Sequence, residues 1–139
     1  MLEVTDEVPG TPELIKWFDY WPSFHDAEVL DLKLDRTGRS TVRVHTFEMT
    51  DQVNRQGSFI CTKHVIVSFV FDGITNLHLD DFNGQNVISE LLLRQTNEGY
   101  ELSLEPCYGL QGTITAHRVC VELEPGIPSG SQYLKLAGT

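Results

Sequence analysis

Long apolar runs are missing from this chain of 139 residues. None approaches the roughly 18 residues that a membrane-spanning helix needs, so the sequence predicts no membrane association. The first seven residues are acidic and no apolar stretch follows them, which is unlike a secretory signal. Together these features predict a cytoplasmic protein.

Cysteine is also scarce. Cys61, Cys107 and Cys120 are widely spaced, and no C-x-x-C pair occurs. An odd number of cysteines in a chain without an export signal predicts reduced thiols. Because structural zinc sites are built from closely spaced cysteines and histidines, the sequence predicts no metal site, and it predicts no cofactor.

Basic residues are outnumbered two to one. Ten lysines and arginines stand against 20 acidic residues, which gives a net charge of -10. Nucleic-acid binding depends on cationic side chains that displace counterions from phosphates, so nucleic acid is not an expected partner. A negative field attracts basic proteins and speeds their encounter. It also aids solubility, and both interpretations remain open.

The chain predicts a single domain, 1–139, with its core at about residues 11–124, a loose N-terminal arm and a C-terminal tail rich in Gly, Pro and Ser. Thr11 as the cap and Pro12 at the first helical position predict the start of a helix. Apolar residues continue at helical spacing until Pro22, which ends the helix. We expect its aromatic face to pack on a sheet.

Most of the remaining chain alternates apolar and polar residues, as half-buried strands do. Residues 30–34 and 42–46 predict a hairpin, and residues 65–71 are apolar at nearly every position, as in a strand covered on both faces. Asp72-Gly73 predicts a turn, and residues 87–94 fit either a helix or a strand. The expected fold class is α+β, with the N-terminal helix packed on a mostly antiparallel sheet of six or seven strands.

The dipeptide His25-Asp26 suggests chemistry, because a carboxylate can orient a histidine as a general base and both residue types bind metals. Neighbouring residues on a strand point to opposite faces, however, and the other four histidines show no ligand-like spacing. We therefore favour a structural joint between helix and sheet, formed by Trp21, Phe24, His25 and Asp26, and assign no catalytic residue. A metal-dependent or ligand-binding site around His25 and Asp26 is the alternative.

Six carboxylates are candidate partner-binding residues. They are Asp80, Asp81, Glu101, Glu105, Glu122 and Glu124. The four glutamates fall in pairs, each pair on one face of a predicted strand, and the two aspartates lie in a predicted loop. If the two strands pair, the glutamates line the solvent side of the sheet. Like charges on neighbouring strands cost stability, which favours a docking surface for a basic protein; an ordinary solvated face is the alternative.

Several segments carry a resemblance to a known family. The run Trp21-Pro22-Ser23-Phe24-His25-Asp26-Ala27-Glu28, followed by leucines at alternate positions, resembles the opening of the immunity protein 50 family of bacterial polymorphic toxin systems. Residues 71–74, 82–88 and 108–109 are also similar to that family, so the resemblance covers about residues 14–124.

This resemblance implies a non-enzymatic protein that binds and neutralises a cognate toxin in the cytoplasm of the producing cell. A basic nuclease would suit an acidic inhibitor, because a nuclease must itself attract phosphates. A structural subunit of a homo-oligomer is a further alternative, and the sequence does not predict the oligomeric state.

Overall fold

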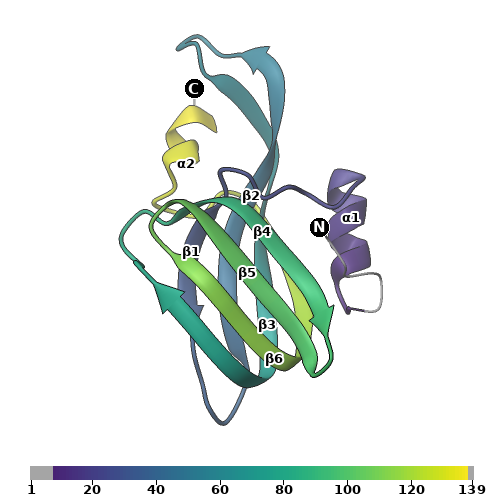
Figure 1. Ribbon diagram of the computed structural model, residues 1–139. Coiled ribbons are helices and arrows are strands. Elements are labelled where there is room, and N and C mark those ends of the chain that lie inside the picture. Colours follow the sequence, from purple (N-terminus) through teal and green to yellow (C-terminus); the bar gives the residue numbers. More distant parts are fainter. Residues whose placement is uncertain (1–7, 138–139) are drawn as a thin grey trace.

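The computed structural model describes residues 8–137. Six strands form a closed antiparallel barrel in the order β1-β2-β3-β6-β5-β4, with one short helix near each end of the chain (Figure 1). The elements are α1 (Thr11–Phe18), β1 (Glu28–Lys33), β2 (Ser40–Val53), β3 (Phe59–Asp80), β4 (Val87–Thr96), β5 (Gly99–Tyr108), β6 (Gln111–Pro125) and α2 (Gln132–Ala137). No helix in this part of the chain is long and apolar enough to cross a membrane.

The predicted fold class is confirmed only in part. The antiparallel pairing, the six strands and the N-terminal helix agree with the expectation, but the helix is small and the fold is predominantly β. The ambiguous segment 87–94 is strand β4. The sheet also closes on itself, which removes most of its edges.

Apolar side chains from all six strands fill the barrel, and the strand alternation explains how. On β5, Leu102 and Leu104 are buried while their neighbours face outward. On β3, Val67 and Phe69 belong to the central core, and Val70, which alternates with them, is also buried. The prediction of a strand covered on both faces over 65–71 is thereby confirmed.

Helix α1 is anchored against β6 by its start. Gly10, the N-cap, has a φ of 93°, and a Cβ there would lie 1.8 Å from the carbonyl oxygen of Val121, so only glycine fits. Thr11 is therefore the first helical residue and not the cap, and its hydroxyl donates to the carbonyl of Val8 at 2.8 Å. Phe18 is 1% exposed, so the apolar face of the helix packs inward as expected.

The predicted turn at Asp72-Gly73 is wrong. Strand β3 continues through it to Asp80, and its register against β6 shifts between Ile74 and Asn76. Gly73 has a φ of 70°, a conformation that costs glycine little, so the chain bends there and does not reverse. One long strand therefore replaces the two segments expected on either side of that turn.

Beyond the barrel, β2 and β3 continue as a two-stranded arm, residues 46–64 (Figure 1). The last residue of β2 that pairs with β1 is His45, and the first residue of β3 that pairs with β6 is Val65. The strands of the arm consequently pair only with each other. Residues 54–58 join the two strands of the arm, since β2 runs to Val53 and β3 begins at Phe59.

The two ends of the barrel sheet meet in a narrow seam. Strands β1 and β4 share the single register pair Glu28 and Val87. The amide of Ile88 donates to the carbonyl of Ala27 at 3.0 Å, and that of Asp26 donates to the carbonyl of Ile88 at 2.9 Å. A few backbone hydrogen bonds therefore close the barrel.

The predicted loose N-terminal arm and C-terminal tail both contain residues that pack against the rest of the protein. Residues 1–7 of the N-terminal arm lie outside the described residues, but Val8 is 1% exposed. The C-terminal tail contains helix α2, and Ser131 just before it is buried. Packing against the barrel thus orders residues that the composition alone marks as a tail.

Candidate functional site

The joint predicted at Trp21, Phe24, His25 and Asp26 lies at the barrel seam. Phe24 and Asp26 have φ values of 60° and 65°, which non-glycine residues seldom adopt. The ring of Phe24 is buried, with its centroid 5.9 Å from the rings of both Trp21 and Phe69. With these left-handed backbone conformations, the side chain of Phe24 lies in the core and that of His25 lies outside it.

His25 and Asp26 contact the backbone of β4 in different ways. The His25 side chain is 61% exposed, and its Nδ1 lies 3.2 Å from the carbonyl oxygen of Ser89. Asp26 uses its amide, which donates to Ile88, and its carboxylate lies 3.8 Å from Nε2 of His25. Within residues 8–137, no group of three or more His, Cys, Asp or Glu is arranged to hold a metal ion.

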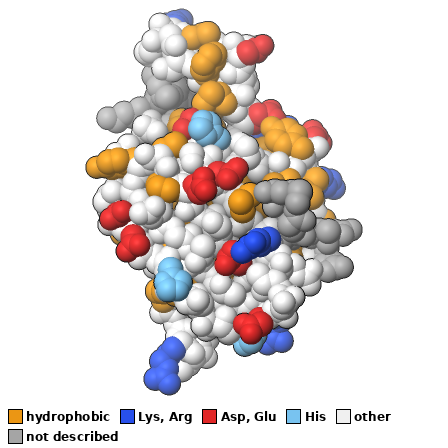
Figure 2. Space-filling model, in the orientation of Figure 1, with side chains coloured by type: hydrophobic (Ala, Val, Ile, Leu, Met, Phe, Trp, Pro, Cys, Tyr) orange, Lys and Arg blue, Asp and Glu red, His pale blue; other side chains and the backbone are white. Residues whose placement is uncertain are grey.

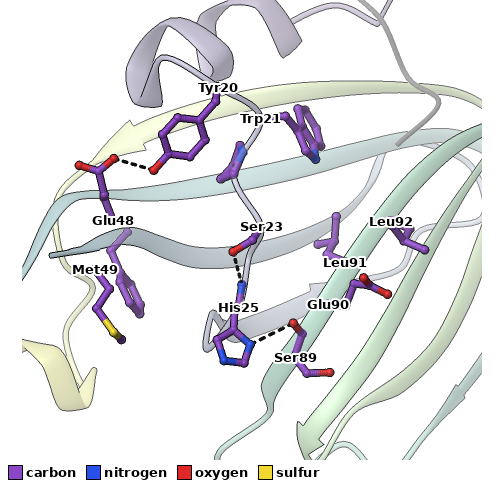
Figure 3. A pocket seen from close by; sticks show the side chains of 12 residues that line it. Tyr20, Trp21, Ser23, His25, Glu48, Met49, Ser89, Glu90, Leu91 and Leu92 are labelled. Atoms are coloured by element: carbon purple, nitrogen blue, oxygen red, sulfur yellow. Dashed lines mark hydrogen bonds between the residues drawn. The ribbon is translucent and has the colours of Figure 1, made fainter. Parts of the chain in front are cut away.

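A cleft of about 590 Å³ lies beside the joint (Figure 3). Residues 47–49 of the arm form one wall, residues 89–92 of β4 form the other, and the linker residues 20–25 run between them. The side chains of Glu48 and Glu90 are the two lining carboxylates, and no lysine or arginine lines the cleft. Apolar side chains and two carboxylates therefore line the cleft.

Tyr20 ties the linker to the arm. Its hydroxyl donates to Oε2 of Glu48 at 2.5 Å, and this bond, with burial and the charges of Glu48 and Asp19, raises the pKa of Tyr20 to about 12. Lys63 lies 3.8 Å from Glu48 and 3.7 Å from Asp19. Tyr20 therefore stays protonated near neutral pH, and its side chain is half-exposed.

A buried polar chain lies behind the cleft, and the sequence did not indicate it. His45 is 0% exposed, and its Nδ1 and Nε2 lie 2.7 Å from Oε1 of Glu28 and 3.0 Å from Nδ1 of His64. Ser131, at the start of α2, donates to the same Glu28 oxygen at 2.6 Å. The ring of Tyr133 packs 4.4 Å from that of Phe47. This buried polar chain thus holds α2 against the base of the arm.

Within this buried polar chain, the pKa values of Glu28 and His64 are both lowered. Burial raises the pKa of Glu28, but the hydrogen bonds from His45 and Ser131 outweigh burial and leave that pKa below its usual value. Burial lowers the pKa of His64, and the charge of His45 lowers it further. Ser131 donates to a carboxylate and not to a histidine, so these residues do not form a nucleophile activated by a base.

The predicted glutamates do not form a single row. Strands β5 and β6 do pair, with Glu101 opposite Thr115. Glu122 and Glu124 lie farther along β6, where it pairs with β3. Arginines also partly neutralise the set: Arg94 lies 2.6 Å from Glu101 and Arg39 lies 3.1 Å from Glu122.

The structure instead brings together a different group, here named the acidic row. Its members are Glu90, Glu105, Asp80 and Asp81. Glu90 and Glu105 are exposed and lie directly opposite each other on β4 and β5, and among the side chains described for residues 8–134 neither has an ion-pair partner. Asp80 lies at the same level across β6, because Gly112 pairs with both Leu104 and Leu79.

Asp81 completes the acidic row and accepts a hydrogen bond from Gln111 at 3.2 Å. Figure 2 shows acidic side chains over the face that carries β4 and β5. Sequence reasoning missed Glu90 because residues 87–94 fitted two periods equally, so its face and its neighbours were not defined.

The fold and the site define a small, predominantly β-barrel domain whose surface carries a cleft and an unpaired acidic row. The chain matches the family model described as Immunity protein 50 over residues 10–124, and it belongs to that family. The resemblance inferred from the sequence is thereby confirmed. Membership gives the chain the general role of an immunity protein, for which binding of a cognate toxin is implied. No curated protein and no solved structure matches the chain.

Proposed function

We propose that this protein neutralises its cognate toxin in the cytoplasm by binding alone, without an enzymatic step, cofactor, nucleic acid or membrane. The proposal further assigns the toxin to basic proteins, with a nuclease as the specific candidate. Family membership supports the immunity role, and the net charge of -10 supports a basic partner. A nuclease suits this charge because it must attract phosphates, which an acidic protein surface can replace.

The observation that carries the choice of partner is the opposition of Glu90 and Glu105. These two like charges lie directly opposite each other on neighbouring strands, and such a pair destabilises a sheet. A lysine or arginine of a partner placed between these carboxylates would remove that repulsion. The pair therefore favours association with a basic surface over remaining solvated.

The six carboxylates predicted from the sequence stay candidate contacts, with unequal roles. Asp80, Asp81 and Glu105 lie in the acidic row and form the centre of the proposed encounter surface. Glu101, Glu122 and Glu124 lie outside it, and arginines beside Glu101 and Glu122 weaken their attraction for a partner. We expect these three to contribute mainly to the overall field.

Co-expression with the toxin encoded by the neighbouring gene tests the immunity role. Cells that carry both genes should survive, whereas cells that carry the toxin alone should not. Equal killing in the two strains would show that the immunity role against this toxin is wrong.

Association kinetics test the role of charge. Raising the salt concentration should slow association far more than it speeds dissociation, because exposed charges are screened beyond about 8–10 Å. Glu105→Lys should slow association more than Glu101→Lys, since Glu101 already has an arginine partner. If salt and both substitutions leave the association rate unchanged, inhibition stands but the acidic encounter surface does not.

A further inference from the structure

We propose that the cleft between the arm and β4 receives an extended, positively charged segment of the cognate toxin. The inference rests on the proposed function and names the surface that holds the bound toxin, as distinct from the surface that attracts it. The cleft residues Trp21, Glu48, Met49 and Leu92 lie outside the acidic row, and Glu90 belongs to both surfaces.

Two strand edges border the cleft. In the arm, β2 pairs with β3 on one side, and on the other side its pairing with β1 ends at His45. Strand β4 pairs with β5 along its length, but its register with β1 is limited to Val87. Among the described residues, Ile88 is the only residue of β4 that forms backbone hydrogen bonds with the linker 19–27. Such edges are templates for an added strand, which is why an extended segment fits.

The cleft presents apolar surface that the fold leaves uncovered. Met49 is 47% exposed and Tyr20 is 48% exposed, and Trp21 and Leu92 are each partly exposed beside them. Farther along the arm, Val53 and Phe59 are more than half exposed. Aromatic and methionine side chains gathered on one surface are typical of binding sites and not of solvated faces.

The charge of the cleft decides the chemistry of the segment. Its two carboxylates come from opposite walls, Glu48 from the arm and Glu90 from β4, and no cationic side chain lines the space between them (Figure 3). Lys63 contacts Glu48 at 3.8 Å, whereas Glu90 has no ion-pair partner among the side chains described for residues 8–134. A segment with lysine or arginine beside apolar residues therefore matches both the carboxylates and the apolar lining.

Matched substitutions test the site with the purified toxin of the neighbouring gene. Met49→Glu changes the cleft, and Leu34→Glu makes the same change at a side chain of similar exposure, 51%, outside it. Glu90→Lys reverses a charge on the cleft wall, and Glu98→Lys reverses one in the turn between β4 and β5. Each variant is first checked for an unchanged circular dichroism spectrum and melting temperature.

We expect Met49→Glu and Glu90→Lys to increase the dissociation rate of the complex roughly tenfold or more, and the two controls to leave it within about twofold. Hydrogen exchange of the wild-type complex should show new protection at residues 47–49 and 89–92. Binding without that protection, with equal dissociation rates for all four variants, would overturn the cleft proposal and leave the proposed function standing. Absence of binding by the wild-type protein would overturn both.

Discussion

The carboxylate of Glu28 and the imidazole of His45 form a 2.7 Å hydrogen bond between β1 and β2. His45 is fully buried and Glu28 is nearly so, with a side chain 13% exposed. Glu28 also accepts a hydrogen bond from Ser131, and His45 contacts His64 on β3. One buried pair therefore connects two strands of the barrel, the base of the arm and the start of α2.

The stability of the protein should fall as the pH is lowered from about 7.5 to 4. The folded state lowers the pKa values of both Glu28 and His64, so the unfolded chain binds protons more readily than the folded chain. The contribution of His64 is present above its unfolded pKa of about 6.5, and that of Glu28 above about 4.3; each is lost as the pH falls below those values.

Urea unfolding at several pH values measures this effect. His64→Gln should flatten the dependence between about pH 7 and 5, whereas His78→Gln, at an exposed position of β3, should leave it unchanged. An identical pH dependence for His64→Gln and the wild-type protein would show that His64 does not contribute.

Removing the hydroxyl of Ser131 should loosen α2. The substitution Ser131→Ala deletes a hydrogen bond to a largely buried carboxylate, and we expect a loss of about 1–3 kcal/mol in the free energy of unfolding. Ser103→Ala, on β5, is the control and should change that free energy by less than about 0.5 kcal/mol. Equal losses for the two variants would contradict the role assigned to Ser131.

Phe18→Ala should destabilise the protein by about 3–5 kcal/mol, because the ring is 1% exposed and its removal leaves a cavity between α1 and the barrel. Tyr20→Ala, two residues later, removes a ring that is 48% exposed and should cost much less. Thermal unfolding monitored by circular dichroism compares the two. A larger loss for Tyr20→Ala would reverse our assignment of the core face.

Substitutions of Asp26 distinguish the structural-joint hypothesis from the metal-site hypothesis. Its φ of 65° suits glycine, and its carboxylate lies 3.8 Å from Nε2 of His25. Asp26→Gly should therefore keep near wild-type stability, whereas Asp26→Val should cost about 1–2 kcal/mol through backbone strain. Elemental analysis provides the second measurement: stoichiometric zinc or manganese that disappears in Asp26→Gly would establish the metal site and contradict the joint.

Local patterns predicted the faces of the elements better than their partners. Alternation identified the inward leucines of β5, and helical spacing identified Phe18, because each depends on residues close in sequence. Closure of the barrel depends on Glu28 meeting Val87, and the buried chain depends on Glu28, His45 and Ser131 meeting across the whole length of the protein. No local period contains that information.

In the candidate site, too, single residues could be predicted from the sequence but their neighbours could not. The aspartates at 80 and 81 and the glutamate at 105 could be selected by charge and exposure. Whether a carboxylate has an ion-pair partner depends on the strand register, however. Arg94 reaches Glu101 only because β4 pairs with β5 in a register that places the two residues opposite each other. The opposition of Glu90 and Glu105 arises from that same register.

The projection of the arm beyond the barrel separates the residues proposed to hold a toxin from those that maintain the fold. Substitutions at Met49, Val53 and Phe59 alter exposed surface and leave the central core unchanged. Such a domain can diversify its arm under selection from a changing toxin while its barrel stays the same. Grafting residues 47–62 between related chains would then transfer recognition from one toxin to another, which makes the arm a natural unit for engineering new inhibitor specificities.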